Sequence, residues 1–286
     1  MAIVLDNITY TYGMGTPFEK TALHGISLTI ETGEFLGVIG HTGSGKSTFV
    51  QHLNGLLHPT TGTVTVNGVD ISASTEEAKK MRHKVGMVFQ YPEHQLFEET
   101  IAQDIAFGPK NLGLSADEVD ERVRDAMKFV GLDYNTYAER SPFHLSGGQM
   151  RRVAIAGVVA MNPDFLVLDE PSAGLDPFGR EEIFEEIIRL HKEKGITVIL
   201  VSHNMEDISR MASRLVVLDK GRIVLDGEPM DIFNNHRDEL QAVGVDVPPV
   251  SVTMEYLREQ GLDVSNRVLS VDDAVQAILE GGSHVK

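Results

Sequence analysis

The stretch from Phe35 to residue 57 restricts most strongly what this chain can fold into. The apolar run Phe35–Ile39 predicts a buried strand, and the residues after it match the phosphate-binding pattern G-x-x-x-x-G-K-[ST]. Apolar residues at helical spacing then predict a helix over residues 46–57. A glycine-rich loop and a helix N-terminus both direct backbone N–H groups at an anion. This order of strand, loop and helix therefore predicts a nucleoside triphosphate site, and an ordinary glycine-rich turn is the disfavoured alternative.

The residues of this loop have separate expected tasks. The loop consists of Gly40, His41, Thr42, Gly43, Ser44, Gly45, Lys46, Ser47 and Thr48. Its glycines let the backbone curl around phosphate groups, because glycine tolerates conformations that other residues avoid. We expect Lys46 to reach the terminal phosphates and the Ser47 hydroxyl to bind Mg²⁺.

Two carboxylates follow another apolar run, which predicts a strand buried on both faces of a parallel sheet. Asp169 and Glu170 stand directly after Leu166, Val167 and Leu168. Ligands of open α/β sheets lie beyond the carboxyl ends of the strands. We therefore expect Asp169 to hold Mg²⁺ and Glu170 to polarise a water for attack on the γ-phosphate. Two acids that simply end a strand at the surface are the weaker interpretation.

Three further residues are candidates because of their position. Gln90 follows a predicted strand, where its amide could bind Mg²⁺ and contact the γ-phosphate, although a surface glutamine explains it equally well. His203 follows another strand and could donate to the γ-phosphate. Tyr12 could stack on a base ring, and Tyr10 and Phe18 compete for that role.

A second anion-binding helix start follows Leu145. It consists of Ser146, Gly147, Gly148 and Gln149, in which a helix-capping residue precedes two glycines. One nucleotide does not need two such cradles from the same chain. We therefore expect this cradle to serve a nucleotide bound to a neighbouring chain, whereas the pentapeptide alone would indicate only a capped helix.

Composition narrows the class of protein. The chain has 286 residues, 42% of them apolar, no cysteine and a formal net charge of −17. The acidic balance argues against broad contact with nucleic acid, which requires a basic surface. No apolar run reaches the roughly 18 residues that a membrane helix needs, and the N-terminus lacks a signal-peptide pattern. We expect a cytoplasmic protein whose membrane role, if it has one, requires a membrane partner.

The order of the predicted elements indicates the fold class. Strands and helices alternate, so we expect an α/β phosphate-loop NTPase with a mostly parallel sheet and an antiparallel β subdomain. Residues 1–235 would form the ATPase domain, with a helical insert at about residues 91–161 that carries the Ser146 cradle. Residues 236–286 would form a small helical extension, serving either as a dimer contact or regulator, or only as a solvated cap.

Together these motifs resemble those of the ATP-binding cassette ATPases over residues 3–230. The resemblance implies ATP and Mg²⁺ as cofactors, Tyr12 as the stacking aromatic, Gln90 in a coupling loop, Glu170 as catalytic base and His203 as switch histidine. It also implies that two cassettes meet head to tail, with each ATP between the phosphate loop of one chain and the Ser146 cradle of the other. The loop that crosses this interface is Ser172, Ala173, Gly174, Leu175 and Asp176.

A narrower resemblance is visible in residues 90–97 and 106–109, which are similar to the ATPases of energy-coupling factor transporters. Residues 16–23 and the acidic tail resemble the second of the two sister ATPases of that system. The resemblance implies a heterodimer with the sister ATPase at the cytoplasmic face of the membrane. It further implies a transmembrane coupling protein and exchangeable substrate-binding membrane subunits that import vitamins or metal ions.

Two other functions compete with this interpretation. One is a soluble cassette ATPase that acts on DNA or ribosomes, and the other is the ATPase of a different importer class, such as one for amino acids. The single cassette, the lack of a long heptad run and the net charge of −17 disfavour the soluble ATPase. Residues 91–97 discriminate between importer classes, because they should face the membrane partner.

Overall fold

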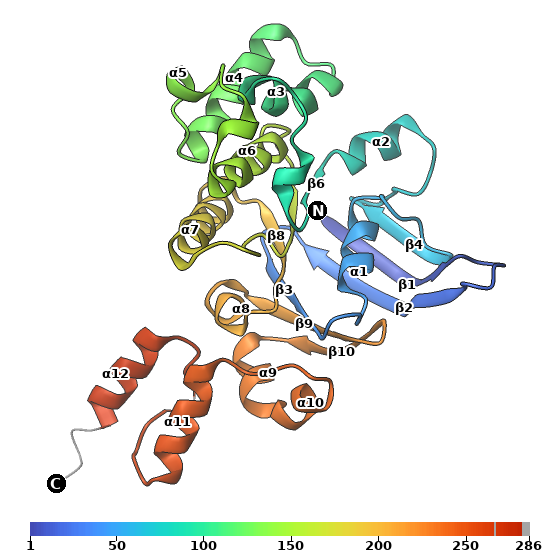
Figure 1. Cartoon of the computed structure of the whole chain (residues 1–286). Helices are drawn as coiled ribbons and strands as arrows, with labels where there is room; N and C mark the ends of the chain where they lie inside the picture. Colours follow the sequence, from blue (N-terminus) through green and yellow to red (C-terminus); the bar gives the residue numbers. More distant parts are fainter. Residues whose placement is uncertain (266, 282–286) are drawn as a thin grey trace.

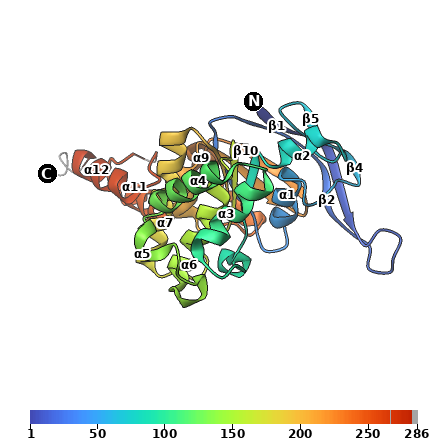
Figure 2. The same cartoon turned by 90° about the horizontal axis from the view of Figure 1, so that it is seen from above.

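The computed structural model of the chain describes residues 1–265 and 267–281. Asn266 and residues 282–286, which belong to the predicted extension, lie outside the described residues. A central sheet carries a β subdomain on one side, a helical subdomain at one end and the C-terminal helices at the other end (Figure 1). Seen from above, the C-terminal helices and the β1–β2 loop lie at opposite ends of the molecule (Figure 2).

The strands form two sheets. They are β1 (Ala2–Tyr12), β2 (Lys20–Glu31), β3 (Phe35–Ile39), β4 (Thr61–Val66), β5 (Val69–Asp70), β6 (Val85–Val88), β7 (Phe165–Asp169), β8 (Thr197–Val201), β9 (Arg214–Asp219) and β10 (Arg222–Gly227). The antiparallel sheet has the order β2-β1-β4-β5, and the larger sheet has the order β10-β9-β3-β8-β7-β6. The strands from β9 to β6 in that order are mutually parallel, and only β10 is antiparallel to its neighbour. The predicted fold class is confirmed.

The helices are named in chain order. They are α1 (Lys46–Leu53), α2 (Glu76–Arg82), α3 (Ile101–Asn111), α4 (Ala116–Phe129), α5 (Tyr134–Tyr137), α6 (Gly147–Val159), α7 (Pro177–Lys194), α8 (Met205–Met211), α9 (Pro229–Asn235), α10 (Arg237–Ala242), α11 (Pro249–Glu259) and α12 (Val271–Gly281), with 3₁₀ turns η1 (Pro92–Gln95) and η2 (Pro142–His144). Helices α3 to α6 form the helical subdomain (Figure 1).

The larger sheet separates two hydrophobic cores. One core packs α1 and the antiparallel sheet against one face, and it includes the buried rings of Phe49 and Phe165. The other core packs the helical subdomain, α7 and α8 against the opposite face, and Phe184 and Phe233 are buried in it. Strands β3, β7 and β8 are buried along their whole length, as expected for strands covered on both faces. The loops at their carboxyl ends therefore start from rigid positions.

Several elements differ from the sequence prediction. The first helix ends at Leu53 rather than at residue 57, because Asn54 closes it and Gly55 adopts a left-handed φ of +74°. Helices α2, α8, α9 and α10 are among the elements that the sequence did not predict. They are six or seven residues long, and α2 buries only Ala78, so their apolar periodicity is too short to detect.

The C-terminal segment has two parts with different packing. Leu240 and Val245 are buried in the core around Phe233. Further along, α11 and α12 form their own small cluster around Met254, which Val264, Val268 and Ala274 complete. Among residues 1–265 and 267–281, none of the helices combines the length and the apolarity needed to span a bilayer.

Candidate nucleotide-binding site

The predicted phosphate residues line one cavity of about 710 Å³ at the carboxyl ends of the parallel strands. Its lining brings together Tyr12, Thr42, Gly43, Gly45, Lys46, Ser47, Thr48, Gln90, Asp169, Glu170 and His203. These residues are distant in the sequence. They lie on β1, on the loop between β3 and α1, on the first turn of α1, at the last position of β7, and in the loops after β6, β7 and β8. The sheet therefore brings most of the residues singled out by the motifs to one cavity, whereas Gly40, His41 and Ser44 do not line it.

The phosphate loop has the backbone that its glycines permit. Gly40 has a φ of +153°, and a Cβ there would lie 2.2 Å from the Leu218 carbonyl, so only glycine fits. Gly45 has a φ of +107° and directly precedes α1, whose N-terminus opens toward the cavity. A helix N-terminus with free N–H groups favours an anion at this place.

Lys46 is held inside the loop. Its side chain is 7% exposed, and its ammonium donates to the Gly40 carbonyl at 2.7 Å and to the His41 carbonyl at 3.1 Å. Burial lowers the pKa of Lys46, and the charges of Glu170 and Asp169 oppose this effect. Lys46 thus lies next to both acids of the cavity, where it can contact a phosphate group.

Two loop residues that do not line the cavity contact the β9–β10 hairpin instead. The His41 ring lies 3.0 Å from the Asp219 carboxylate through Nε2 and 2.7 Å from the Thr42 carbonyl through Nδ1. Ser44 is buried, and its carbonyl accepts from the Gly221 N–H at 2.8 Å. These contacts attach the loop to the β9–β10 hairpin, so His41 and Ser44 support the loop from outside the cavity.

The oxygen ligands present in the cavity fit Mg²⁺. Ser47 offers a hydroxyl, Gln90 an amide oxygen and Asp169 a carboxylate, all of which are the hard oxygen ligands that Mg²⁺ prefers. Asp169 is 6% exposed. Burial raises its pKa, while a hydrogen bond with the Ser47 side chain and the Lys46 charge lower it. The hydrogen bond places Ser47 and Asp169 close enough to share one ion.

Glu170 and His203 lie close together just after the carboxyl ends of β7 and β8. His203 Nε2 lies 3.1 Å from Glu170 Oε1, and the carboxylate is 12% exposed. Burial raises the pKa of Glu170 to about 7, the His203 backbone amide opposes this shift, and the Asp169 charge adds to it. Burial lowers the pKa of His203, and the Lys46 charge lowers it further. A carboxylate that titrates near neutral pH is suited to take a proton from water.

The three candidate aromatic residues have different surroundings. Tyr12 is 41% exposed, lines the cavity and hydrogen-bonds through its hydroxyl to the Thr48 hydroxyl at 3.1 Å. Tyr10 packs edge-on between Tyr12 and His52, with ring centroids 4.7 and 4.9 Å away. Phe18 is 87% exposed and does not line the cavity. Of these three residues, Tyr12 is the one that lines the cavity.

The second cradle lies in a separate cavity of about 730 Å³. Its lining includes Ser146, Gly147, Gly148, Gln149, Gly174, Leu175 and Asp176 but no residue of the phosphate loop. Ser146 caps α6 and forms a capping box with Gln149. Asp176 caps α7 by accepting from the Gly179 N–H at 2.7 Å. Ser172 and Ala173 precede this lining in the turn after β7 and do not line the cavity.

Other residues of the first cavity were missed by sequence reasoning. Lys20 and His24 on β2, and Lys220 in the β9–β10 turn, line it as well. They belong to no motif, and only the pairing of distant strands brings them to the cavity. Their basic character in an acidic chain is the one signal that could have drawn attention to them.

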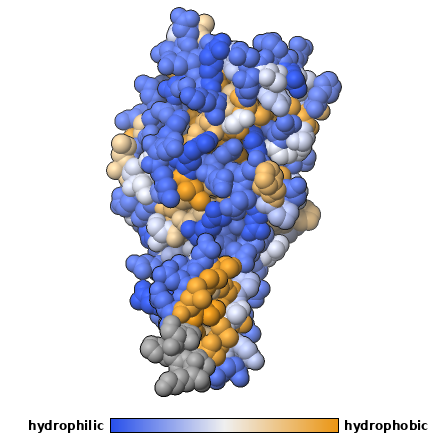
Figure 3. All heavy atoms as spheres, turned by 90° about the vertical axis from the view of Figure 1, so that its left-hand side faces the viewer, coloured by the Kyte–Doolittle hydropathy of each residue, from blue (hydrophilic) through white to orange (hydrophobic). Residues whose placement is uncertain are grey.

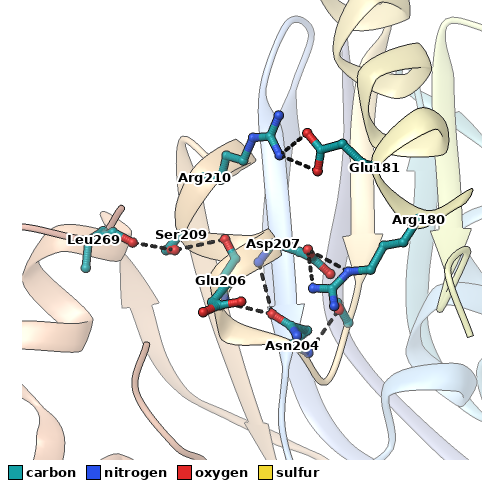
Figure 4. Close-up of polar contacts among 9 residues, drawn as sticks. Arg180, Glu181, Asn204, Glu206, Asp207, Ser209, Arg210 and Leu269 are labelled. Carbon is teal, nitrogen blue, oxygen red and sulfur yellow. Dashed lines mark hydrogen bonds and ion pairs between the residues drawn. The ribbon is translucent and has the colours of Figure 1, made fainter. Parts of the chain in front are cut away.

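The helix that follows His203 is attached to both neighbouring parts of the chain (Figure 4). Arg180 of α7 donates to the Asp207 carboxylate of α8 at 2.5 Å, and burial raises the pKa of Asp207 against the effect of Arg180. On the other side, the Ser209 hydroxyl donates to the Leu269 carbonyl of the C-terminal segment at 3.1 Å. No sequence pattern predicted these contacts, which attach α8, the helix that follows His203, to α7 and to the C-terminal segment.

The fold and the phosphate site together define an ATP-binding cassette. The model of the ABC transporter family matches residues 23–173, more than half of the chain. Curated relatives named energy-coupling factor transporter ATP-binding protein EcfA2 cover nearly all of it. The one from Clostridium tetani is 53% identical over 98% of this chain and 97% of its own length. The one from Clostridium acetobutylicum is 54% identical over 98% of this chain and 97% of its own length.

Solved structures agree with these relatives. The protein cbiO1 from Clostridium perfringens, described as part of the ABC transporter complex cbiONQ, superposes with a TM-score of 0.73. The two sequences are 36% identical, and the superposition covers 88% of this chain and 98% of the cbiO1 chain. The dimeric cassette MJ0796 bound to ADP and phosphate superposes with a TM-score of 0.70 and is 31% identical. The superposition covers 79% of this chain and 98% of the MJ0796 chain. The chain belongs to the ABC transporter family, within its group of energy-coupling factor transporter ATPases, and its activity is ATP hydrolysis coupled to transport.

Proposed function

We propose that two cassettes, this chain and a sister ATPase, bind ATP between them in a head-to-tail dimer. The observation that carries this proposal is the separation of the two anion cradles. The phosphate loop lines one cavity, whereas Ser146 and Gly147 line another that contains no residue of that loop. The second cradle is therefore available to the nucleotide of a partner chain. The description of MJ0796 as a dimer supports the same arrangement.

Within this dimer, we assign a separate role to each candidate side chain of the phosphate cavity. Tyr12 stacks on the base, Lys46 binds the terminal phosphates, and Ser47, Gln90 and Asp169 hold Mg²⁺, which would neutralise phosphate charge. Glu170 accepts the proton of the attacking water, and His203 orients the γ-phosphate. The proximity of Glu170 to His203 and the raised pKa of Glu170 support this assignment. ATP binding closes the cassettes, and hydrolysis allows them to open.

The motor acts on membrane partners. We assign to it a transmembrane coupling protein and substrate-binding membrane subunits, through which vitamins or metal ions are imported. The chain would lie as a peripheral protein on the cytoplasmic face of the membrane. Exposed Phe97, which packs edge-on against Phe107 at 4.8 Å, supports a contact for the coupling protein beside Gln90. The names of the EcfA2 relatives and of cbiO1 support a transporter rather than a soluble ATPase for DNA or ribosomes.

We further propose residues 1–235 as the ATPase domain, with residues 91–161 as its helical part, and residues 236–286 as an extension that contacts the sister ATPase. Exposed apolar residues four positions apart, Val271, Val275 and Leu279, lie on one face of α12. Figure 3 shows an apolar surface at the lower end of the molecule, where Figure 1 places the C-terminal helices. A row of exposed apolar side chains on one helix face supports a contact with another protein.

Affinity purification from membranes tests the proposal. The chain is tagged in its host, membranes are solubilised in mild detergent, and the co-purifying proteins are identified. Recovery of a second cassette ATPase together with an integral membrane protein is the expected result. Recovery in the soluble fraction with ribosomes or DNA-binding proteins would contradict the membrane partners and leave only the ATPase activity.

A further inference from the structure

One charged side chain of α6 is buried away from both cavities. Arg151 is 2% exposed and lines neither the phosphate cavity nor the second cradle. Its guanidinium donates through Nη1 to the Pro171 carbonyl at 2.9 Å. Through Nη2 it donates to the Glu93 carboxylate at 3.2 Å. Arg151 therefore joins three parts of the fold: the helix behind the second cradle, the turn after β7, and η1.

Each of the two contacted segments is adjacent to a residue of the proposed mechanism. Pro171 directly follows Glu170, and Glu93 lies three residues after Gln90 in the 3₁₀ turn η1. The Arg151 side chain thus spans the distance between the segment expected to contact the coupling protein and the segment that carries the catalytic carboxylate.

The backbone at Glu170 depends on such contacts. Glu170 has a φ of +53°, in the left-handed region, which is strained for a non-glycine residue. The Val201 carbonyl accepts from the Glu170 N–H at 3.0 Å and holds one side of the turn. Arg151 holds the other side through the carbonyl of Pro171. A change in the Arg151 position therefore moves the peptide that fixes the Glu170 side chain.

Arginine is suited to this connection in a way that lysine is not. Its planar guanidinium presents donors in a fixed fork, so that one side chain can hold two acceptors at a fixed separation. An ammonium group is a point charge that would favour the Glu93 carboxylate over the neutral carbonyl of Pro171. A buried ion pair is also weak evidence for stability, because apolar residues of similar volume often replace one without loss.

We propose that Arg151 is a positioning residue that transmits movement of the Gln90 segment to the Glu170 carboxylate. The inference rests on the proposed function, because it requires a membrane partner that moves this segment. When the coupling protein presses against the Gln90 segment, it displaces Glu93. The Arg151 guanidinium follows the Glu93 carboxylate, and the Glu170–Pro171 turn shifts with the guanidinium. Hydrolysis is thereby stimulated when the membrane subunits are engaged.

The test compares ATP hydrolysis by the two-ATPase dimer alone with hydrolysis by the complete complex with its co-purified membrane subunits. The ratio of the two kcat values measures stimulation. Two variants are compared with the wild type: Arg151→Lys, and the double variant Arg151→Met with Glu93→Met. The double variant removes the bridge without leaving a buried unpaired charge, so it is expected to fold and to bind ATP.

The expected result is that the double variant loses at least about tenfold in stimulation while the KM for ATP stays within about twofold. Arg151→Lys keeps the charge but loses stimulation as well, because it cannot hold both acceptors. A purely structural role predicts instead that the double variant and Arg151→Lys both keep wild-type stimulation, and this outcome would overturn the inference.

A matched control is the ion pair Arg124–Asp120, which is exposed on α4 of the same subdomain with a 2.7 Å separation. Arg124→Gln combined with Asp120→Asn is expected to keep wild-type stimulation. Failure to recover any membrane protein with the wild type would contradict the proposed function itself. A wild-type complex that forms but shows no stimulation would contradict the role of Arg151 alone.

Discussion

His203 Nε2 lies 3.1 Å from Glu170 Oε1, and this oxygen has no hydrogen-bond partner among the described residues. The two groups are close enough to attract each other, but they are not aligned as donor and acceptor. This oxygen is buried from solvent and keeps an unused lone pair, and Glu170 lines the phosphate cavity. A water that approaches the γ-phosphate can donate to it, and the pKa of about 7 allows Glu170 to accept a proton.

The first prediction concerns this carboxylate. Glu170→Gln should bind ATP and dimerise, but its kcat for hydrolysis should fall by about 10² or more, because an amide cannot accept the proton. Single-turnover hydrolysis and size-exclusion chromatography with ATP measure the two properties. The exposed Glu77→Gln on α2 serves as control and should hydrolyse normally. Normal turnover in Glu170→Gln would remove Glu170 from the role of base.

The second prediction concerns Lys46. Its ammonium is buried against the loop carbonyls and can reach a phosphate only from inside the cavity. Lys46→Ala should weaken ATP binding by roughly 10- to 100-fold, the value of a hydrogen bond to a charged group. Calorimetric titration with ATP measures the Kd. Lys80→Ala, exposed on α2, should bind as the wild type does, whereas an unchanged Kd in Lys46→Ala would argue against the phosphate-loop assignment.

Whether the sequence predicted a feature depended on how far apart in the chain the interacting residues are. Local patterns predicted the strand Phe35–Ile39, the phosphate loop and the paired acids after β7, because each depends on neighbours in the chain. The pairing of Arg151 with Glu93 links residues 58 positions apart and leaves no local pattern. The same holds for Lys220, which reaches the cavity only because β9 pairs with β3.

The third prediction concerns the surface expected to contact the coupling protein. Phe97 is 58% exposed, whereas Gln95 is partly buried with its Oε1 unpaired among the described residues. Phe97→Asp should therefore disturb the surface more cleanly than a change at Gln95. Co-purification of the membrane protein should fall about tenfold, equivalent to a loss of roughly 1.4 kcal/mol. Phe18→Asp is a control on the distant β1–β2 loop, and equal losses in both variants would show that the Phe97 surface is not specific.

The fourth prediction concerns the exposed face of α12. Val275→Asp places a charge in the middle of the apolar row between Val271 and Leu279. If this face contacts the sister ATPase, the variant should weaken the dimer by about 1–3 kcal/mol, because a buried contact would now hold an unpaired charge. Sedimentation of the two ATPases with ATP measures the dimer. Asp272→Asn, on the same helix, should leave it intact, and an unchanged dimer in Val275→Asp would leave the extension as a solvated cap.

The fifth prediction concerns pH and a carboxylate outside the cavity. Burial raises the pKa of Glu186 from 4.5 to about 7, and the charges of Arg152 and Arg189 oppose this shift. Between these values the folded chain holds a proton that the unfolded chain has released, so stability falls as the pH rises through this window and stays reduced above it. Glu186→Gln removes the titrating group, whose Oε2 has no hydrogen-bond partner among the described residues.

The variant should therefore gain stability relative to the wild type at pH 8, and the gain should shrink toward pH 4.5. The difference between the two ends should be about 1–3 kcal/mol, because one pKa unit corresponds to 1.36 kcal/mol and Arg152 retains part of the charged form. Urea unfolding at several pH values measures it. Glu185→Gln, exposed on the same turn of α7, should show no such pH dependence. A gain for Glu186→Gln that is constant from acid to alkaline pH would show that the carboxyl group is not protonated in the folded chain.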